Sequence, residues 1–305
     1  MVWLAVPGLG VSVLKKALHG LAAKIAVEDL HATAKFALLA LVLIPVLPNK
    51  TYGPLNVLNP FKIGLMIVLV AGISFVGYVA ARILGSGRGL LATGVIGGLI
   101  SSTAVTLTFA GRSKEEPKLA PVSAVAIGAA SSTMFARILA VLSVIDRPLL
   151  APLALPLVAM TVTGFGVAAA LYRRNVAEQR SEALPLRNPF ELKTAIRFGL
   201  LYGAVLFVAK AAQVYVGAAG VFGSAVLAAL TDVDAITLSL AELHREGLSV
   251  DTAAAGILLA ATTNTLVKAA LATSLGGWAL GKGVSTVLGS TVVVGGAVAL
   301  ATLAH

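Results

Sequence analysis

Long apolar segments recur along the whole chain and are separated only by short polar ones. A helix needs about 20 predominantly apolar residues to cross a bilayer, and most of these segments reach that length. Of the 305 residues, 58% are hydrophobic and 12% are charged, whereas a soluble domain has about 25% charged residues. The sequence therefore predicts an all-α fold, a polytopic transmembrane helix bundle with no soluble domain of useful size.

The apolar segments predict about nine membrane spans, preceded by an amphipathic helix on the membrane surface. That helix covers residues 15–30, where lysines and acidic residues lie among Leu, Ala and Ile. Residues 1–14 are apolar but short for a full span. The nine spans are expected at about 31–48, 62–84, 91–110, 120–143, 150–171, 194–213, 220–241, 252–275 and 284–303.

The chain repeats itself at a distance of 131 residues. Residues 99–110 (LISSTAVTLTFA) align with residues 230–241 (LTDVDAITLSLA) with five identities in twelve positions, and the same shift relates Arg137 to Lys268. This register predicts two repeats of four helices each, after an N-terminal part (1–55) that holds the surface segment and the first membrane helix. The repeats cover 56–173 and 186–305. Four spans in each repeat would give both the same orientation, whereas one re-entrant segment would make the repeats inverted.

Two carboxylates, Asp232 and Asp234, interrupt the apolar stretch 225–241. An acidic residue near the centre of a membrane helix costs about 2.5–3.5 kcal/mol on insertion scales, so such residues are usually functional. Asp234 shares a helical face with Thr237, three residues on. Two residues that are two apart cannot face one site on a regular helix. Either the aspartates serve different neighbours, or the helix is broken at this point and frees backbone carbonyls as ligands.

Carboxylates, hydroxyls and carbonyls are hard oxygen ligands that suit Mg²⁺ and other small cations. We therefore expect Asp232 and Asp234 to bind a metal ion on an ion pathway between the repeats. Arg137 and Lys268 leave an alternative open, in which they neutralise the aspartates, and both could also reach the membrane interface. The candidate pathway residues are Asp232, Asp234, Thr237, Asn264 and Lys268, with Ser101, Ser102 and Thr103 opposite.

Charge and composition exclude several other functions. The net charge of +10 comes from Lys and Arg residues that mostly lie between apolar segments, as expected for anchors on a lipid bilayer. The sequence shows no basic face with interleaved aromatic residues, so we do not expect nucleic-acid binding. The chain has no cysteine, and it lacks a Ser-His-Asp set, an HExxH sequence or a zinc pattern. We therefore expect neither an enzyme nor a cofactor.

Three segments resemble a known family. They are residues 98–110 (GLISSTAVTLTFA), 229–241 (ALTDVDAITLSLA) and 260–268 (AATTNTLVK). They are similar to the C-terminal membrane module of unknown function that follows an MgtC/SapB domain in many bacterial and archaeal proteins. The resemblance covers about residues 15–305, and the MgtC/SapB domain itself is not visible. It implies a link to the homeostasis of Mg²⁺ or another ion and supplies no catalytic residue.

We expect an integral membrane transporter or channel for a small ion, first of all a divalent cation such as magnesium. The alternative is a non-transporting regulatory or scaffold protein of the membrane, linked to ion homeostasis, whose aspartates form internal ion pairs. The distribution of Lys and Arg predicts a multi-pass protein of the cell (inner) membrane with a cytoplasmic C-terminus. The many small residues are compatible with a homodimer.

Overall fold

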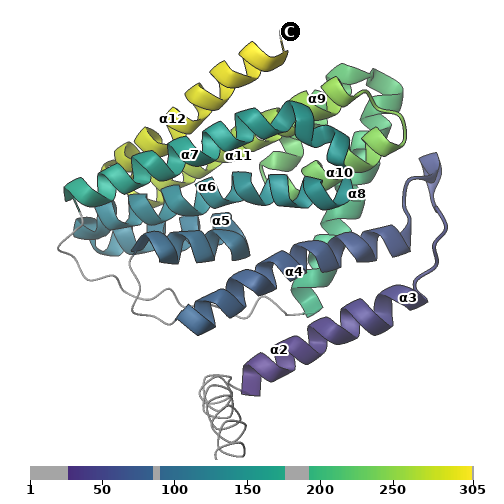
Figure 1. Cartoon of the computed structure of the whole chain (residues 1–305), viewed down its shortest axis with the longest axis horizontal. Coiled ribbons are helices and arrows are strands. Elements are labelled where there is room, and N and C mark those ends of the chain that lie inside the picture. The colour runs from purple at the N-terminus through teal and green to yellow at the C-terminus, as the bar shows by residue number, and fades with distance from the viewer. Residues whose placement is uncertain (1–26, 85–89, 176–191, 304–305) are drawn as a thin grey trace, which may run out of the picture.

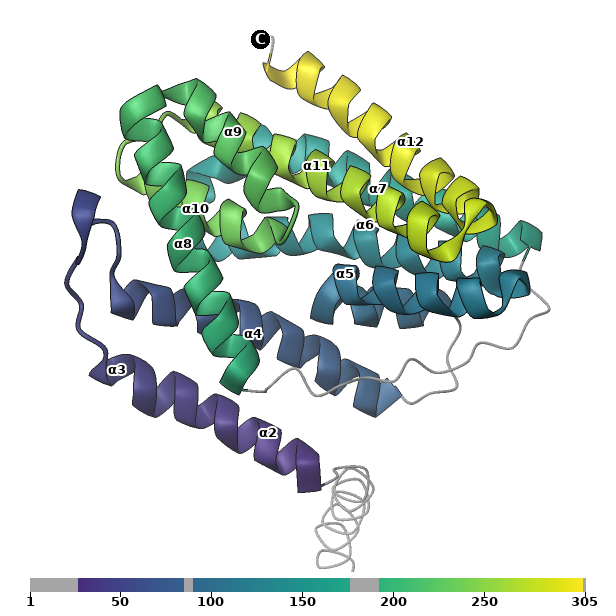
Figure 2. The ribbon, with the colours of Figure 1, turned by 180° about the vertical axis from the view of Figure 1, so that it is seen from behind.

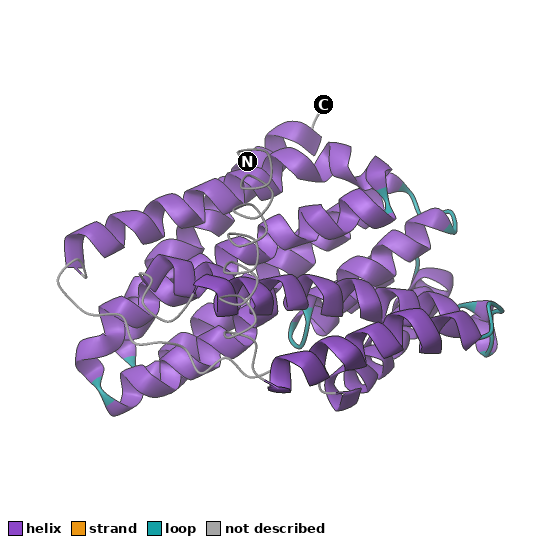
Figure 3. Ribbon diagram, turned by 60° about the horizontal axis from the view of Figure 1, so that its bottom comes forward, coloured by secondary structure: helices purple, strands orange, loops and turns teal. Residues whose placement is uncertain are grey.

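The structure of the chain, a computed structural model, describes residues 27–84, 90–175 and 192–303, and within these ranges it is helical without a β-strand (Figures 1 and 3). This confirms the all-α class for the described residues. The surface helix predicted at residues 15–30 lies almost wholly outside the described residues. The short apolar segment 1–14 lies wholly outside them. The α-helices are α2 (Val27–Leu38), α3 (Ile44–Val46), α4 (Pro60–Leu84), α5 (Leu90–Glu115), α6 (Ala120–Ile145), α7 (Leu150–Asn175), α8 (Leu192–Val216), α9 (Ala218–Ala229), α10 (Val233–Arg245), α11 (Val250–Gly276) and α12 (Trp278–Leu303).

Seven of the described helices are long and apolar enough to cross a membrane, where the sequence predicted about nine spans. Two predicted spans correspond to shorter apolar helices, Thr33–Val46 and Ala218–Ala229. The first of these includes a π-helical turn, Leu39–Leu43, between α2 and α3. The count of nine is therefore not confirmed, whereas the multi-pass character is. The seven are Pro60–Ala80, Leu91–Glu115, Pro117–Ile145, Arg147–Arg174, Thr194–Val216, Val250–Gly276 and Trp278–Thr302.

Large apolar side chains cover much of the outside of the bundle. Leu41, Leu200 and Leu300 are 75%, 71% and 76% exposed. A soluble monomer rarely displays large continuous apolar patches, because each one exposes apolar area to water. The outer surface is therefore suited to contact with lipid, which agrees with the hydropathy of the helices.

Helix α6 is the centre of the bundle. Of the residues in its apolar membrane-spanning stretch, 83% are buried inside the protein, far more than in the other long helices. Small residues allow neighbouring backbones to approach it closely. A methyl group added to Gly98 of α5 would lie 2.6 Å from the carbonyl oxygen of Ala130. Glycine at this position therefore permits the contact between α5 and α6.

Helix α5 reverses direction at Ser101, whose backbone is extended (φ −167°, ψ 108°) inside an otherwise helical segment. Before the break, α5 runs along α6 in the same direction, because Gly94 lies against Ala126 and Gly98 against Ala130. After the break it returns to the start of α6, since only a short 3₁₀ turn, Pro117–Leu119, joins the two helices. In Figures 1 and 2, α5 accordingly extends along only part of α6. We call Leu90–Glu115 hairpin 1.

Helices α9 and α10 form a second hairpin, which we call hairpin 2 (residues 218–245). Both lie along the first half of α11: a methyl group on Gly256 would lie 2.8 Å from Leu240 of α10 and 3.9 Å from Val221 of α9. The end of α9 reaches the middle of α11, where the Asn264 amide donates to the Ala229 carbonyl over 2.8 Å. The predicted span at 220–241 is therefore two short helices that fold back on each other (Figure 2).

The two hairpins enter the bundle from opposite ends. At one end, the Ser113 hydroxyl of hairpin 1 donates to the Gly276 carbonyl at the end of α11. At the other end, His244 of hairpin 2 contacts Asp146, directly after α6. Helices α6 and α11 are therefore antiparallel, and the tips of both hairpins meet near the middle of the bundle.

Candidate functional site at the tips of two hairpins

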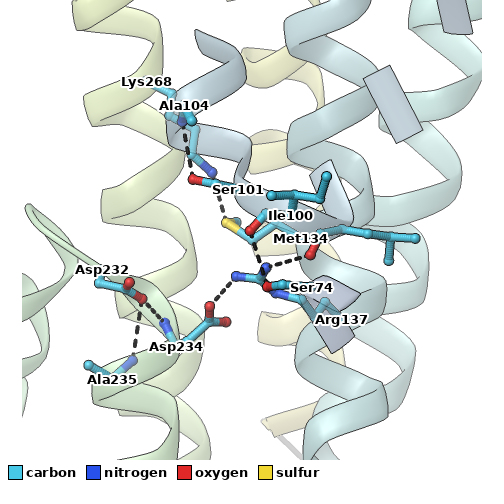
Figure 4. A network of polar contacts seen from close by, with 11 residues as sticks. Ser74, Ile100, Ser101, Ala104, Met134, Arg137, Asp232, Asp234, Ala235 and Lys268 are labelled. Atoms are coloured by element: carbon cyan, nitrogen blue, oxygen red, sulfur yellow. Dashed lines mark hydrogen bonds and ion pairs between the residues drawn. The ribbon is translucent and has the colours of Figure 1, made fainter. Parts of the chain in front are cut away.

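Both chain breaks are capped in the same way (Figure 4). Asp232 is extended (φ −155°, ψ 124°), and its Oδ1 accepts hydrogen bonds from the amides of Asp234 at 2.7 Å and Ala235 at 3.4 Å. In hairpin 1, the Ser101 Oγ accepts from the amide of Ala104 at 3.2 Å. The two capping residues are 131 positions apart, as are Ala104 and Ala235. The structure combines the two arrangements that the sequence left open: the helix is broken at Asp232, and the two aspartates contact different partners.

A buried ion pair joins the two tips through α6. The Arg137 guanidinium pairs with the Asp234 carboxylate, and it also donates to the carbonyl of Leu99 over 3.1 Å. The side chains are 8% and 4% exposed, so Arg137 points into the bundle and does not reach the interface. The Ser74 hydroxyl donates to the next carbonyl, that of Ile100, at 3.3 Å. The carbonyls that the break leaves without a helical partner are thus bound by neighbouring side chains.

Asn264 and Lys268 approach the tips from α11. Asn264 binds the last carbonyl of α9 and is 3% exposed. Lys268 is 1% exposed, and its ammonium contacts the thioether of Met134 at 2.8 Å. The structure therefore brings Asp232, Asp234, Asn264 and Lys268 into one neighbourhood with Ser101.

The remaining predicted residues lie in each hairpin on the helical segment that follows the chain break. Thr237 follows Asp234 by one turn and is buried, and its hydroxyl is without a partner in the described part of the chain. Ser102 is buried in the first turn after the Ser101 break, and its carbonyl accepts from Thr106 at 2.9 Å. Thr103 is half-buried in the same turn. These three residues flank the tips of the hairpins.

The aspartates are both engaged by the protein itself. Asp232 caps α10, and Asp234 is held by Arg137. Among the described residues, no group of three or more His, Cys, Asp or Glu side chains could hold a metal ion. The prediction of a metal at Asp232 and Asp234 is not tested by these contacts, and a cation there would have to replace the guanidinium.

Sequence reasoning did not find the ion pairs that fasten the base of hairpin 2. The buried Glu242 carboxylate pairs with Lys62 of α4, His244 contacts Asp146 at 2.7 Å, and Glu246 pairs with Lys210 of α8 at 2.9 Å. The signal for them was the charge density at the end of the predicted span 220–241. The partners lie far away in sequence, so their pairing was not visible there.

The helices and the buried tip residues define a multi-pass membrane protein with two broken helices at its centre. The chain belongs to a family described as a domain of unknown function (DUF4010), whose model matches residues 68–276. An uncharacterized protein from Aquifex aeolicus (strain VF5) is 33% identical over 189 residues, which are 61% of this chain and 82% of that protein. No solved structure matches. Neither comparison supports the link to MgtC/SapB, which stays a prediction.

Proposed function

We propose that this protein is an integral membrane transporter for a small ion, with its pathway between two structurally related halves. One observation carries the proposal: the chain breaks at Ser101 and Asp232 enter from opposite ends and meet around Arg137. Broken helices are unfavourable in lipid and are tolerated only where they are buried in protein or line a water-filled cavity. In many secondary transporters, such helices bind the substrate near the middle of the membrane.

The proposed halves are inverted repeats of three crossing helices and one re-entrant hairpin. The first contains α4, hairpin 1, α6 and α7, and the second contains α8, hairpin 2, α11 and α12. An odd number of crossings reverses the orientation of the second half. The antiparallel course of α6 and α11 supports this, as does the common register of the two capping residues.

The proposed topology changes the expected orientation of the chain. The end of the bundle at which α6 begins carries many of the basic residues, and we place it in the cytoplasm. Helix α12 begins at this end, so the C-terminus lies on the opposite side, whereas regular spans predicted a cytoplasmic C-terminus. The basic residues at this end include Arg112, Lys114, Lys118, Arg173, Arg174 and Lys282.

We propose a divalent cation such as Mg²⁺ as the first substrate to test, because Asp234 is a hard oxygen ligand at the tip. Binding a cation there requires the carboxylate to leave Arg137. The cation and the guanidinium then compete for Asp234, so the site alternates between a closed ion pair and a loaded form. Such a closed pair would keep the empty carrier from holding an uncompensated charge.

Flux into proteoliposomes tests the function. Wild-type protein should carry at least one ion out of Mg²⁺, Mn²⁺, Ca²⁺ and Na⁺, and Asp234→Asn should abolish that flux. Asp251→Asn is the matched control, because Asp251 is exposed in the first turn of α11. Gel filtration and thermal unfolding establish that each variant is folded. Absence of wild-type flux for every ion would overturn the proposal.

A non-transporting regulatory or scaffold protein is the second candidate, and the buried Arg137–Asp234 pair favours it, because the pair closes the tips without any ligand. This candidate predicts that Asp234→Asn alters only stability. Exchanging the two residues, with Arg137→Asp and Asp234→Arg, should then restore the stability. Neither this variant nor the wild type should carry any ion.

A further inference from the structure

Lys268 is a buried lysine without a carboxylate within ion-pair distance among the described residues. The residue is 1% exposed, and the contact of its ammonium is with the Met134 thioether at 2.8 Å. An ammonium has three donors, and a thioether is a weak acceptor. A buried ammonium is strongly unfavourable unless it is paired or loses its proton, so Lys268 can carry its charge here only with a negative partner.

The nearby charges are committed elsewhere. Arg137, Asp234 and Asp232 are charged residues close to Lys268. Asp234 pairs with Arg137. Asp232 accepts from two amides at the start of α10, so it offsets the positive end of that helix. Neither aspartate forms an ion pair with Lys268 within the part of the chain that the structure describes.

The register of the two halves shows what hairpin 1 lacks. The shift of 131 residues matches Lys268 with Arg137, and both halves therefore place a basic residue at this position. The same shift matches Thr103 with Asp234 and Ser101 with Asp232. Both carboxylates of hairpin 2 are thus hydroxyls in hairpin 1. Arg137 receives a carboxylate from hairpin 2, whereas the tip of hairpin 1 has hydroxyls at both matching positions.

The position of Lys268 fits a ligand at the tip of hairpin 1. Helix α11 packs against α5, and Figure 4 shows the Lys268 side chain directed toward Met134 and the Ser101 break. The helical segment that starts after Ser101 has first-turn amides without a helical partner, of which that of Ala104 donates to the Ser101 hydroxyl. Amides at a helix start and a buried ammonium both favour an anion.

We propose that Lys268 and the first turn after Ser101 bind a small anion of carboxylate size, which occupies the place that the missing acid would have. The inference uses the register of the two halves and the contacts of Lys268. It does not require that the protein transports anything, and a binding measurement without flux therefore tests it separately from the proposed function.

Thermal unfolding of the purified full chain in detergent provides the test. Sodium acetate is compared with the sodium salt of a bulky sulfonate at equal concentration. Acetate should raise the Tm of the wild type in a saturable way, as expected for a ligand that binds only the folded state. Lys268→Gln should lose this rise. Lys114→Gln is the matched control, because Lys114 is exposed at the end of hairpin 1, and it should keep the rise.

Thr103 offers a second test that keeps Lys268 in place. Thr103→Asp supplies the missing carboxylate, so it should raise the Tm without acetate and remove the response to acetate. Thr103→Asn introduces a side chain of nearly the same shape as aspartate without the charge, and this variant should keep the response to acetate. Equal Tm values of the wild type in both salts would overturn the proposal. So would an acetate response that persists in both Lys268→Gln and Thr103→Asp.

Discussion

Arg137 of α6 and Asp234 of α10 form a buried ion pair at the point where the two hairpins meet. The same guanidinium donates to the Leu99 carbonyl of hairpin 1, so one side chain connects both tips to the central helix. A buried pair gains little net stability, because each charge loses its hydration. Removing one partner is costly, since the other charge stays buried alone. The pair is therefore better explained as a device that fixes or switches the arrangement of the tips.

The first prediction concerns this pair. Asp234→Ala should lower the free energy of unfolding by about 3–5 kcal/mol, because it leaves Arg137 buried without its carboxylate. The double variant Arg137→Met, Asp234→Leu should recover most of that loss. Denaturant unfolding in detergent measures both changes. A single variant as stable as the wild type would contradict the assigned burial of the pair.

The second prediction concerns the cap of α10. Asp232→Ala should cost about 0.5–2 kcal/mol of stability, as loss of a capping side chain does. Asp232→Ser should cost much less, because serine caps the equivalent break at Ser101 over 3.2 Å. Thermal unfolding of the two variants side by side makes the comparison. If serine were as harmful as alanine, the Asp232 carboxylate would have a role beyond capping.

Sequence reasoning located the tips but not their geometry. The carboxylates in an apolar stretch, and the spacing of two between Asp232 and Asp234, were enough to predict a special site and to suggest a broken helix. The register of 131 residues also matched the two breaks. A re-entrant segment was left open as an alternative, and the sequence could not decide for it, because both hairpins have the length and hydropathy of a single span. Hydropathy reports the environment of a segment and not its direction.

The partner of Asp234 illustrates the same limit. Lys268, and not Arg137, was placed among the candidate pathway residues, although both are basic and occupy matching positions. The structure distinguishes them because hairpin 2 enters from the end of the bundle at which α6 terminates, which places Asp234 beside Arg137. That relationship depends on the opposed entry of the hairpins, which requires the tertiary structure.

The third prediction concerns the approach of hairpin 1 to α6. A methyl group at position 98 would lie 2.6 Å from the Ala130 carbonyl oxygen, which is backbone and cannot move aside freely. Gly98→Ala should therefore destabilise the protein by about 1–3 kcal/mol, as overpacking does. Gly111→Ala, in the same hairpin, meets no atom within 4 Å and should be neutral or stabilising. Their Tm values should move in opposite directions or differ clearly.

The last prediction tests the reversal of the chain in the membrane. The protein has no cysteine, so single cysteines can be introduced at the exposed positions Lys114 and Asp251. With two re-entrant hairpins, Lys114→Cys and Asp251→Cys lie on opposite sides, because α6 runs from one side to the other, α7 returns and α8 crosses again before hairpin 2. With regular spans, an even number of crossings would place both on the same side. A membrane-impermeant maleimide applied to intact cells should label Asp251→Cys and leave Lys114→Cys unlabelled until the membrane is permeabilised. Equal labelling of both from one side would refute the inverted arrangement of the two halves.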